Sequence, residues 1–232
     1  MKRSVRALLS IPTLFGMALA APAHAQVTVG VAAANTGNCF PIGCNQSLTR
    51  YQQVYTSSAF SGLFNIGSIT FFHTVFNPGT ANYAAGTYNF SLGTTTTAVN
   101  NLSPNYALNN TSPLSLFATV IISPGASAAA STFTFSGNPF LYNPGAGNLL
   151  LDVSFSNSTP SVSTFLDADN SGISTSRAYG SGTLGSADAT GLVTRFGVAG
   201  IINTTAPEPA SVALMAFGLG IVGFAGLRRR QS

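Results

Sequence analysis

The chain has 232 residues and a formal net charge of +4, yet only 6% of its residues are charged. Soluble domains usually contain about a quarter charged residues, so the polar surface here must come mainly from Ser, Thr and Asn. Residues 26–205 hold three arginines, four aspartates and no lysine, which gives that stretch a net charge of −1. Because binding to a phosphate backbone needs clustered Lys and Arg, this composition excludes a nucleic-acid-binding body.

Residues 1–25 have the three-part organisation of a secretory signal peptide. A basic start is followed by an apolar run over 7–20 and by the small-residue cleavage site Ala23-His24-Ala25. We therefore expect a signal helix, export through the Sec route and removal by signal peptidase before Gln26. An uncleaved N-terminal anchor is the alternative, and the shortness of the apolar run disfavours it.

The only two cysteines, Cys39 and Cys44, lie close together in the N-terminal segment of the body, residues 26–47. In an oxidising compartment such a pair predicts a disulfide, and Pro41 and Gly43 supply the chain reversal between the thiols. A loop this short removes little chain entropy, so we expect a local clamp. A redox pair or a metal site is the alternative, but no nearby ligand completes a four-ligand site.

From Leu48 onward, short runs of alternating apolar and polar residues are separated by Gly, Pro, Asn and Ser, which predicts an all-β body. Proline-glycine turns such as Asn143-Pro144-Gly145 divide the runs. The number of runs fits one two-sheet β-sandwich or jelly roll over residues 26–205, with a single core. The nine expected strands cover residues 49–56, 66–76, 86–92, 114–122, 131–136, 149–156, 162–166, 174–178 and 192–202.

Two segments interrupt this strand pattern. Residues 94–110 form a long polar stretch, for which we expect a helical turn or a loop across the end of the sandwich. Residues 179–186 are rich in glycine but lack the lysine of a phosphate-binding loop, so we expect a flexible connection there.

The sequence Asp167-Ala-Asp169-Asn-Ser171-Gly172 is the one ligand-like arrangement in the body. Oxygen-bearing side chains at alternate positions followed by glycine are typical of a calcium loop, so Asp167, Asp169 and Ser171 are candidate calcium ligands. An EF-hand would place its bidentate Glu where Ala178 stands. Since Asp and Asn also initiate turns by bonding their own backbone, a plain β-turn is the alternative.

Residues 206–232 combine a rigid tripeptide, an apolar helix and a basic cluster. Pro207-Glu208-Pro209 favours an extended, exposed peptide. The uncharged run 210–227 would form a helix of about 27 Å, long enough to span a bilayer core. Arg228, Arg229 and Arg230 follow it and favour the cytoplasmic side, so the preceding body is expected outside the inner membrane.

This C-terminal segment resembles the PEP-CTERM sorting signal of Gram-negative bacteria, although Ala206 stands where the family usually has valine. The resemblance implies that an exosortase, an integral-membrane cysteine transpeptidase, recognises the tripeptide and removes the tail. The body would be anchored transiently in the membrane and then passed to the cell envelope or to an extracellular polysaccharide matrix.

A second resemblance covers the later half of the body. Residues 140–153, 165–168 and 189–196 look like motifs that recur in exported PEP-CTERM proteins without an assigned activity. The resemblance implies a jelly-roll-like β domain and no particular substrate. Within it, Asn148 and Asp152 are expected to be structural, Asn148 ending a turn and Asp152 facing out of a strand or bonding a loop.

Catalytic chemistry finds few candidates in the body. His73 is its only histidine, no Gly-x-Ser-x-Gly elbow presents a nucleophile, and Asp167 and Asp169 are too close in sequence to flank a glycosidic bond. We expect His73 to be a half-buried strand residue bonded to a backbone group. The body is therefore predicted to be non-catalytic and to use no cofactor apart from the candidate calcium.

The sequence predicts an exported envelope or matrix protein with a structural or adhesive role, in a biofilm or with exopolysaccharide as partner. A carbohydrate-binding module is the alternative, although the body lacks tryptophan and would rely on tyrosines. A secreted hydrolase is the third candidate and would need His73 within hydrogen-bond reach of both a serine and an aspartate.

Overall fold

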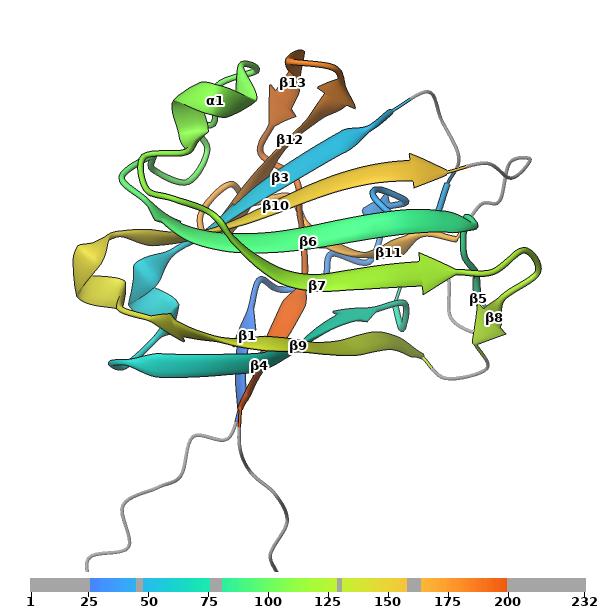
Figure 1. The fold of residues 1–232 in the computed structure, drawn as a ribbon, viewed down its shortest axis with the longest axis horizontal. Coiled ribbons are helices and arrows are strands. Elements are labelled where there is room, and N and C mark those ends of the chain that lie inside the picture. Colours follow the sequence, from blue (N-terminus) through green and yellow to red (C-terminus); the bar gives the residue numbers. More distant parts are fainter. Residues whose placement is uncertain (1–25, 45–47, 76–80, 129–130, 158–163, 200–232) are drawn as a thin grey trace, which may run out of the picture.

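The computed structural model describes residues 26–44, 48–75, 81–128, 131–157 and 164–199 (Figure 1). These residues are mostly β-strand, and all strand pairs are antiparallel, which confirms the all-β prediction. Within these ranges, helical structure is limited to α1 (Tyr106–Asn109) and the 3-10 turns η1 (Ser57–Ala59) and η2 (Pro144–Ala146). None of these described helices could cross a bilayer. The expected signal helix and transmembrane helix lie outside the described residues.

The larger sheet has six strands, and its side chains alternate between an inner and an outer face. On β10, Leu149 and Leu151 point into the core, whereas Leu150 and Asp152 lie on the outer face. The period of two in the sequence therefore corresponds to a sheet covered by the core on one side. The strand order is β13 (Leu184–Asp188), β12 (Thr175–Ser181), β3 (Arg50–Tyr55), β10 (Asn148–Asn157), β6 (Gly86–Thr95) and β7 (Ser115–Ile122).

The second sheet has four strands and faces the first across a common core. Aromatic side chains join the two layers: the ring centroids of Tyr55 and Phe196 are 5.0 Å apart, and those of Phe90 and Phe135 are 4.3 Å apart. Burial of each such ring stabilises the fold by about 2 kcal/mol, so this aromatic layer holds the sheets together. The strand order is β1 (Gln26–Val29), β15 (Thr194–Val198), β4 (Phe64–Phe72) and β9 (Thr132–Tyr142).

Two small sheets complete the body. One, in the order β14 (Gly191–Leu192), β11 (Leu166–Asp169) and β2 (Gly37–Asn38), contacts the inner face of β3. There the buried Gln53 side chain donates to the Leu192 carbonyl and accepts from the Leu192 N–H, both at 2.8 Å. A core amide thus has its backbone partners. The other small sheet pairs β5 (Ala81–Asn82) with β8 (Ser127–Ala128).

On one side of the molecule, edge strands β7 and β9 lie next to each other without forming a ladder. Asn138 donates to the Leu116 carbonyl at 3.4 Å, and a Cβ atom at Gly137 would overlap the carbonyl oxygen of Phe117. Glycine therefore permits the close approach of the two sheets. Beside it, Pro139 is tolerated because β9 is an edge strand with an irregular register.

Several predicted boundaries are wrong. The strand expected at 131–136 continues through Pro139 to Tyr142, and that expected at 162–166 begins only at Leu166. The strand expected at 192–202 is divided into β14 and β15 at Val193. The glycine-rich segment 179–186, predicted as a flexible connection, is the β12–β13 hairpin, whose turn includes Gly182 with φ +69°. The helical turn expected within 94–110 is α1.

Candidate binding surface

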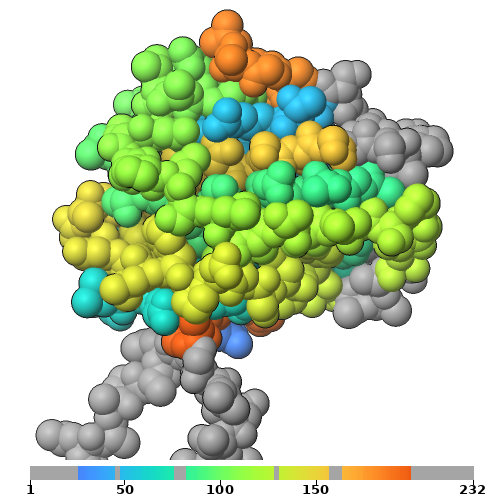
Figure 2. Space-filling view, viewed as in Figure 1, coloured from blue at the N-terminus to red at the C-terminus, as the bar shows by residue number. Residues whose placement is uncertain are grey.

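The outer face of the six-stranded sheet carries polar side chains in cross-strand rows. The register places Arg50, Ser154 and Asn89 opposite one another on β3, β10 and β6, and Thr119 of β7 extends the row. Since adjacent strands lie about 4.8 Å apart, these side chains form a continuous polar strip. Figure 2 shows this side of the molecule, with the strands running beside one another below the bulge made by α1 and the β12–β13 hairpin.

A groove of about 390 Å³ opens along this strip. The side chains of Thr87, Ser154 and Ser156 line it and have no hydrogen-bond partner in the part of the chain that the structure describes. Their hydroxyl groups can therefore both donate to and accept from a ligand or water. The full lining consists of Thr49, Arg50, Thr87, Asn89, Ser154, Phe155, Ser156 and Gly182.

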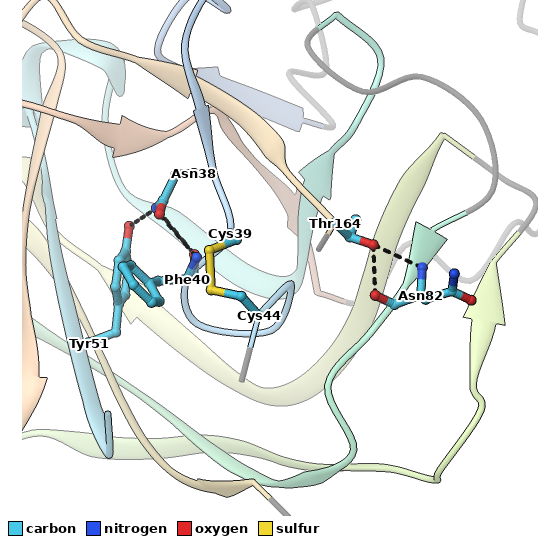
Figure 3. The surroundings of a disulfide bond; sticks show 7 residues. All are labelled: Asn38, Cys39, Phe40, Cys44, Tyr51, Asn82 and Thr164. Carbon is cyan, nitrogen blue, oxygen red and sulfur yellow. Dashed lines mark hydrogen bonds between the residues drawn. A yellow bond between two sulfur atoms is a disulfide. The ribbon is translucent and has the colours of Figure 1, made fainter. Parts of the chain in front are cut away.

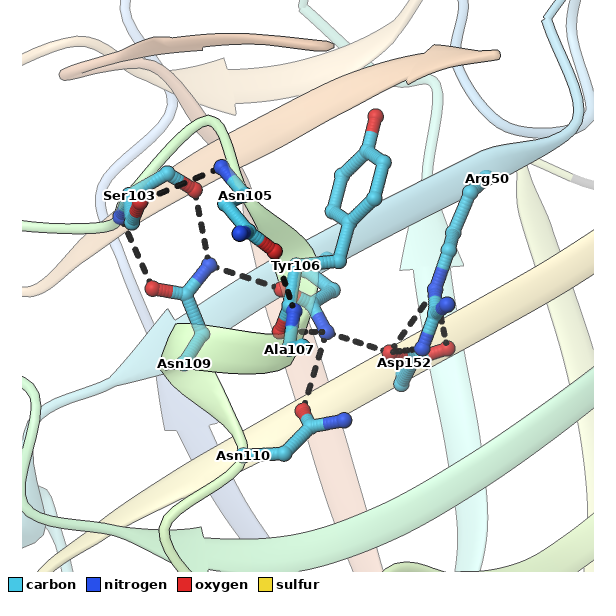
Figure 4. Close-up of polar contacts among 9 residues, drawn as sticks. Arg50, Ser103, Asn105, Tyr106, Ala107, Asn109, Asn110 and Asp152 are labelled. Carbon is cyan, nitrogen blue, oxygen red and sulfur yellow. Dashed lines mark hydrogen bonds and ion pairs between the residues drawn. The ribbon is translucent and has the colours of Figure 1, made fainter. Parts of the chain in front are cut away.

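An ion pair fixes the only charged side chain of the groove lining. The Arg50 guanidinium donates through Nε to both Asp152 oxygens at 3.2 Å and through Nη2 to Oδ2 at 2.7 Å (Figure 4). The Asp152 side chain is 6% exposed and that of Arg50 is 30% exposed. The guanidinium also lies 5.2 Å from the ring centroid of Tyr106. Arg50 is thus held in one orientation at the surface.

Buried amides hold Asp152 in turn. The Gln52 amide donates to Asp152, to the Asn110 side-chain oxygen at 3.0 Å and to the Tyr106 carbonyl at 3.3 Å. Asn109 of α1 donates to the Gln52 side-chain oxygen at 2.8 Å (Figure 4). The polar segment 94–110 therefore covers the sheet and supplies hydrogen-bond partners to a buried carboxylate. Of the two expected roles, Asp152 therefore has that of a residue facing out of its strand: it bonds Arg50 and Gln52 of β3, and only Gln52 bonds the neighbouring loop segment.

Tyr106 anchors α1 to the β12–β13 hairpin. Its ring packs in a small apolar cluster with Val54, Leu150 and Ala178, and a Cβ atom at Gly185 would overlap its phenol oxygen. Burial raises the pKa of Tyr106 to about 12 from an ordinary value of 10.0. The glycines of the hairpin thus leave room for this ring.

Cys39 and Cys44 form a disulfide, with 5.2 Å between their Cα atoms (Figure 3). The loop between them is buried, and its Phe40 stacks on Tyr179 with ring centroids 5.1 Å apart. Asn38 holds the same loop by accepting from the Phe40 N–H at 3.0 Å and donating to its carbonyl at 3.2 Å. The disulfide loop therefore packs on the inner face of β12 and not at the outer groove.

The three calcium candidates are occupied by protein donors. Asp167, 2% exposed, accepts from the Thr74 N–H at 3.0 Å and from the Val75 N–H at 2.9 Å. Asp169 accepts from the Val31 N–H at 3.1 Å and from the Ser171 N–H at 2.8 Å. Ser171 accepts from the Ile173 N–H at 3.2 Å. In the described ranges, no group of three or more His, Cys, Asp or Glu is placed to hold a metal ion.

The turn alternative therefore holds for Asp169, which bonds the backbone two residues ahead, but not for Asp167. Asp167 lies within strand β11 and bonds a distant segment. Its alternate spacing with Asp169 puts both carboxylates on one face of a strand, where each accepts N–H groups from a different loop. Both carboxylates therefore bind backbone N–H groups and hold loops in place. The sequence pattern alone does not distinguish this role from that of calcium ligands.

His73 follows β4 and is 0% exposed. Neither ring nitrogen has a hydrogen-bond partner among the described residues, and the ring centroid lies 6.4 Å from that of Tyr83. The expectation of a half-buried histidine bonded to a backbone group is wrong, because the ring is inserted wholly among core side chains. The His73 backbone N–H donates to the Ser131 carbonyl at 3.0 Å, but among the described residues the His73 ring makes no hydrogen bond to a serine or an aspartate side chain.

Asn148 joins three segments at the start of β10. It accepts from the Ser57 N–H at 2.9 Å and donates to the Thr97 carbonyl at 2.9 Å. Because it follows the 3-10 turn η2, its position agrees with the expected end of a turn.

The predicted sorting residues Pro207, Glu208, Pro209, Arg228, Arg229 and Arg230 lie outside the described residues. Comparison with family models finds the PEP-CTERM protein-sorting motif at residues 205–230, the segment that contains them. No curated protein and no solved structure matches the chain. The motif supports the identification of the chain as an exosortase substrate and covers none of the residues that the structure describes.

Proposed function

Because residues 205–230 carry the PEP-CTERM protein-sorting motif, we propose that the chain is an exported, exosortase-processed protein of the cell envelope or extracellular matrix. Its body, residues 26–205, is a jelly-roll-like sandwich with a non-catalytic structural or adhesive role in a biofilm or exopolysaccharide matrix. Residues 1–25 are removed by signal peptidase after Sec export, and residues 206–232 anchor the chain in the membrane until exosortase acts.

The positions of the first and last described strands support a free groove on a tethered body. Gln26, the expected first residue after signal-peptide cleavage, is paired with Gly197, so β1 and β15 lie side by side in the four-stranded sheet (Figure 1). The outer groove lies on the other sheet. A body tethered through its C-terminal end would therefore keep the groove free for contacts.

The sorting half of the proposal is tested by replacing Pro207, Glu208 and Pro209 with alanine. Mass spectrometry should show the C-terminal tail retained in this variant and removed from the wild type. The matched control replaces Asn203 and Thr204, which lie just before the motif, by alanine and should be processed normally. Identical processing of all three chains would contradict the assignment.

A second candidate function is that of a carbohydrate-binding module. The observation that favours it is the groove, which is lined by one fixed guanidinium and by hydroxyl groups without a hydrogen-bond partner in the described part of the chain. A glycan array probed with the mature chain separates this function from a purely structural one, since a structural body should retain no glycan above background.

A further inference from the structure

We infer that the groove over β3, β10 and β6 binds an uncharged polysaccharide chain, recognised through its hydroxyl groups. This inference rests on the carbohydrate-binding candidate and names the site and the chemical class of ligand. Arg50, Asn89 and Ser154 would contact the ligand, while Asp152 and Gln52 would be positioning residues that hold Arg50.

The charge of the groove selects the class of ligand. Arg50 is the only charged residue of the lining, and Asp152 neutralises it at 2.7 Å. The other two arginines of the body lie elsewhere: Arg177 is paired with Asp188, and Arg195 lies over the Phe72 ring on the other sheet. Because a polyanion gains little from a groove without net positive charge, a neutral chain is the better match.

The available donors and acceptors match a polyol. Ser154, Ser156 and Thr87 each offer a hydroxyl group that can donate and accept, as sugar hydroxyls do. Asn89 accepts from the Thr119 hydroxyl at 2.7 Å, which leaves its amide N–H groups without a partner among the described residues. The Arg50–Asp152 hydrogen bonds use Nε and Nη2, so Nη1 is uncommitted in the same part of the chain.

The side chains that hold Arg50 are buried polar groups, and a surface that only has to be soluble does not need them. Gln52 is 0% exposed, Asn109 is 1% exposed and Asp152 is 4% exposed. Burying polar groups is tolerated only when their hydrogen bonds are complete, as they are here. Such a network fixes the guanidinium before a ligand arrives, which lowers the entropy lost on binding.

The groove also predicts how the ligand binds. Phe155, the one aromatic residue of the lining, is 7% exposed and stacks on Tyr88, so we expect each sugar to be held by hydrogen bonds alone and to bind weakly. A polymer that engages several copies of the protein, or several positions along the row, binds more tightly than its monosaccharide through effective concentration. Salt should have little effect because no net charge is neutralised.

The test measures binding of the mature chain, without signal peptide and C-terminal tail, to three polysaccharides. Two of them, dextran and a soluble mannan, are neutral, and the third, alginate, is a polyanion. We expect binding to at least one neutral polymer that changes less than twofold between low and physiological salt. Asn89→Ala and Ser154→Ala should each weaken it roughly three- to tenfold, the loss of about one hydrogen bond. The control Ser136→Ala, an exposed serine on β9 of the other sheet, should bind as the wild type does.

Arg50→Lys separates a positioned donor from a simple charge. Lysine retains the charge but cannot make the forked contact with Asp152, so we expect weaker glycan binding at a melting temperature within a few degrees of wild type. Binding only to alginate with steep salt dependence, equal binding by Asn89→Ala and Ser136→Ala, or no binding to any neutral polymer would overturn the inference. None of these outcomes changes the removal of the tail, so failure here is distinguishable from failure of the sorting assignment.

Discussion

The buried aspartates Asp152, here called the surface set, and Asp167 and Asp169, the interior set, have their negative charges stabilised in different ways. Asp152 faces a guanidinium and a glutamine amide at the outer surface of the six-stranded sheet. Asp167 and Asp169, on strand β11, face backbone N–H groups of segments distant in sequence. A buried carboxylate needs either a cation or several N–H donors. The first arrangement keeps a charged side chain available at a groove, whereas the second holds loops to the body.

The largest expected effect is from Asp167→Ala, which tests the interior set. The change would leave the buried N–H groups of Thr74 and Val75 without their acceptor. Loss of several charge-assisted hydrogen bonds should lower the free energy of unfolding by about 4 kcal/mol, measured by urea denaturation. Asp167→Asn keeps one acceptor oxygen and should cost less. An Asp167→Ala cost below about 1 kcal/mol would mean that this clamp does not hold the segment.

The second prediction tests the surface set through a double-mutant cycle. Asp152→Ala should lower the free energy of unfolding by about 2 kcal/mol, because Arg50 and Gln52 lose the acceptor that they share. Arg50→Met alone leaves Asp152 bonded to Gln52. The coupling energy between the two positions should be about 1 kcal/mol, because the Arg50 side chain is 30% exposed and partly screened. Additive effects would show that the ion pair contributes nothing to stability.

The sequence predicted the strand content and the inward faces well, because alternation is a local property. The period of two puts Leu149, Leu151 and Val153 on one face of their strand, and all three are in the core. It did not distinguish Asp152 from Asp167, since their partners Arg50 and Thr74 lie 102 and 93 residues away in sequence. In the β3–β10 ladder, Arg50 lies opposite Ser154 and Asp152 lies opposite Gln52. The ladder thus brings Arg50 and Asp152 together although they are 102 residues apart in sequence. The scarcity of charge in the body was the one available signal that this pair mattered.

The glycine-rich hairpin shows a second limit. Residues 179–186 lack apolar alternation, so propensity alone favoured a loop. The segment forms a strand instead because it pairs with β12 and packs against the ring of Tyr106. The glycines of the hairpin leave room for that ring. Tertiary packing overrides local preference at such positions. The role of α1 in closing the polar network was equally invisible, because its four residues carry no helical periodicity.

A third prediction concerns His73, whose ring nitrogens have no hydrogen-bond partner among the described residues although the next residue, Thr74, bonds Asp167. Substituting phenylalanine removes two unsatisfied polar atoms at similar volume, so His73→Phe should be neutral or raise stability by up to about 1 kcal/mol. Thermal melts at neutral pH measure this, with His73→Ala as the cavity-forming control. A loss as large as that of His73→Ala would indicate a polar contact that the ring requires.

The surface set can also be probed at alkaline pH through Tyr106, which packs beside Arg50. Burial raises its pKa to about 12 in the folded chain, so the neutral phenol is favoured by folding. This contribution is complete below pH 10, the ordinary value, and is lost as pH rises toward 12. Tyr106→Phe cannot ionise and should lose less stability than wild type between pH 10 and 12. Parallel stability curves for the two chains would contradict the assignment of the pKa.

The smallest expected effect is that of calcium on the melting temperature, which tests whether Asp167 and Asp169 form a calcium site. N–H groups of Thr74, Val75 and Val31 already point at the carboxylates, and a cation would have to displace these donors. A site filled at a hundredfold excess over its dissociation constant would add about 2.7 kcal/mol of stability. We instead expect equal melting temperatures in millimolar calcium and in chelator, and the same Asp169→Ala destabilisation in both. A rise of several degrees in calcium that disappears in Asp169→Ala would restore Asp167, Asp169 and Ser171 as ligands, and would show that the loops around β11 rearrange to admit the ion.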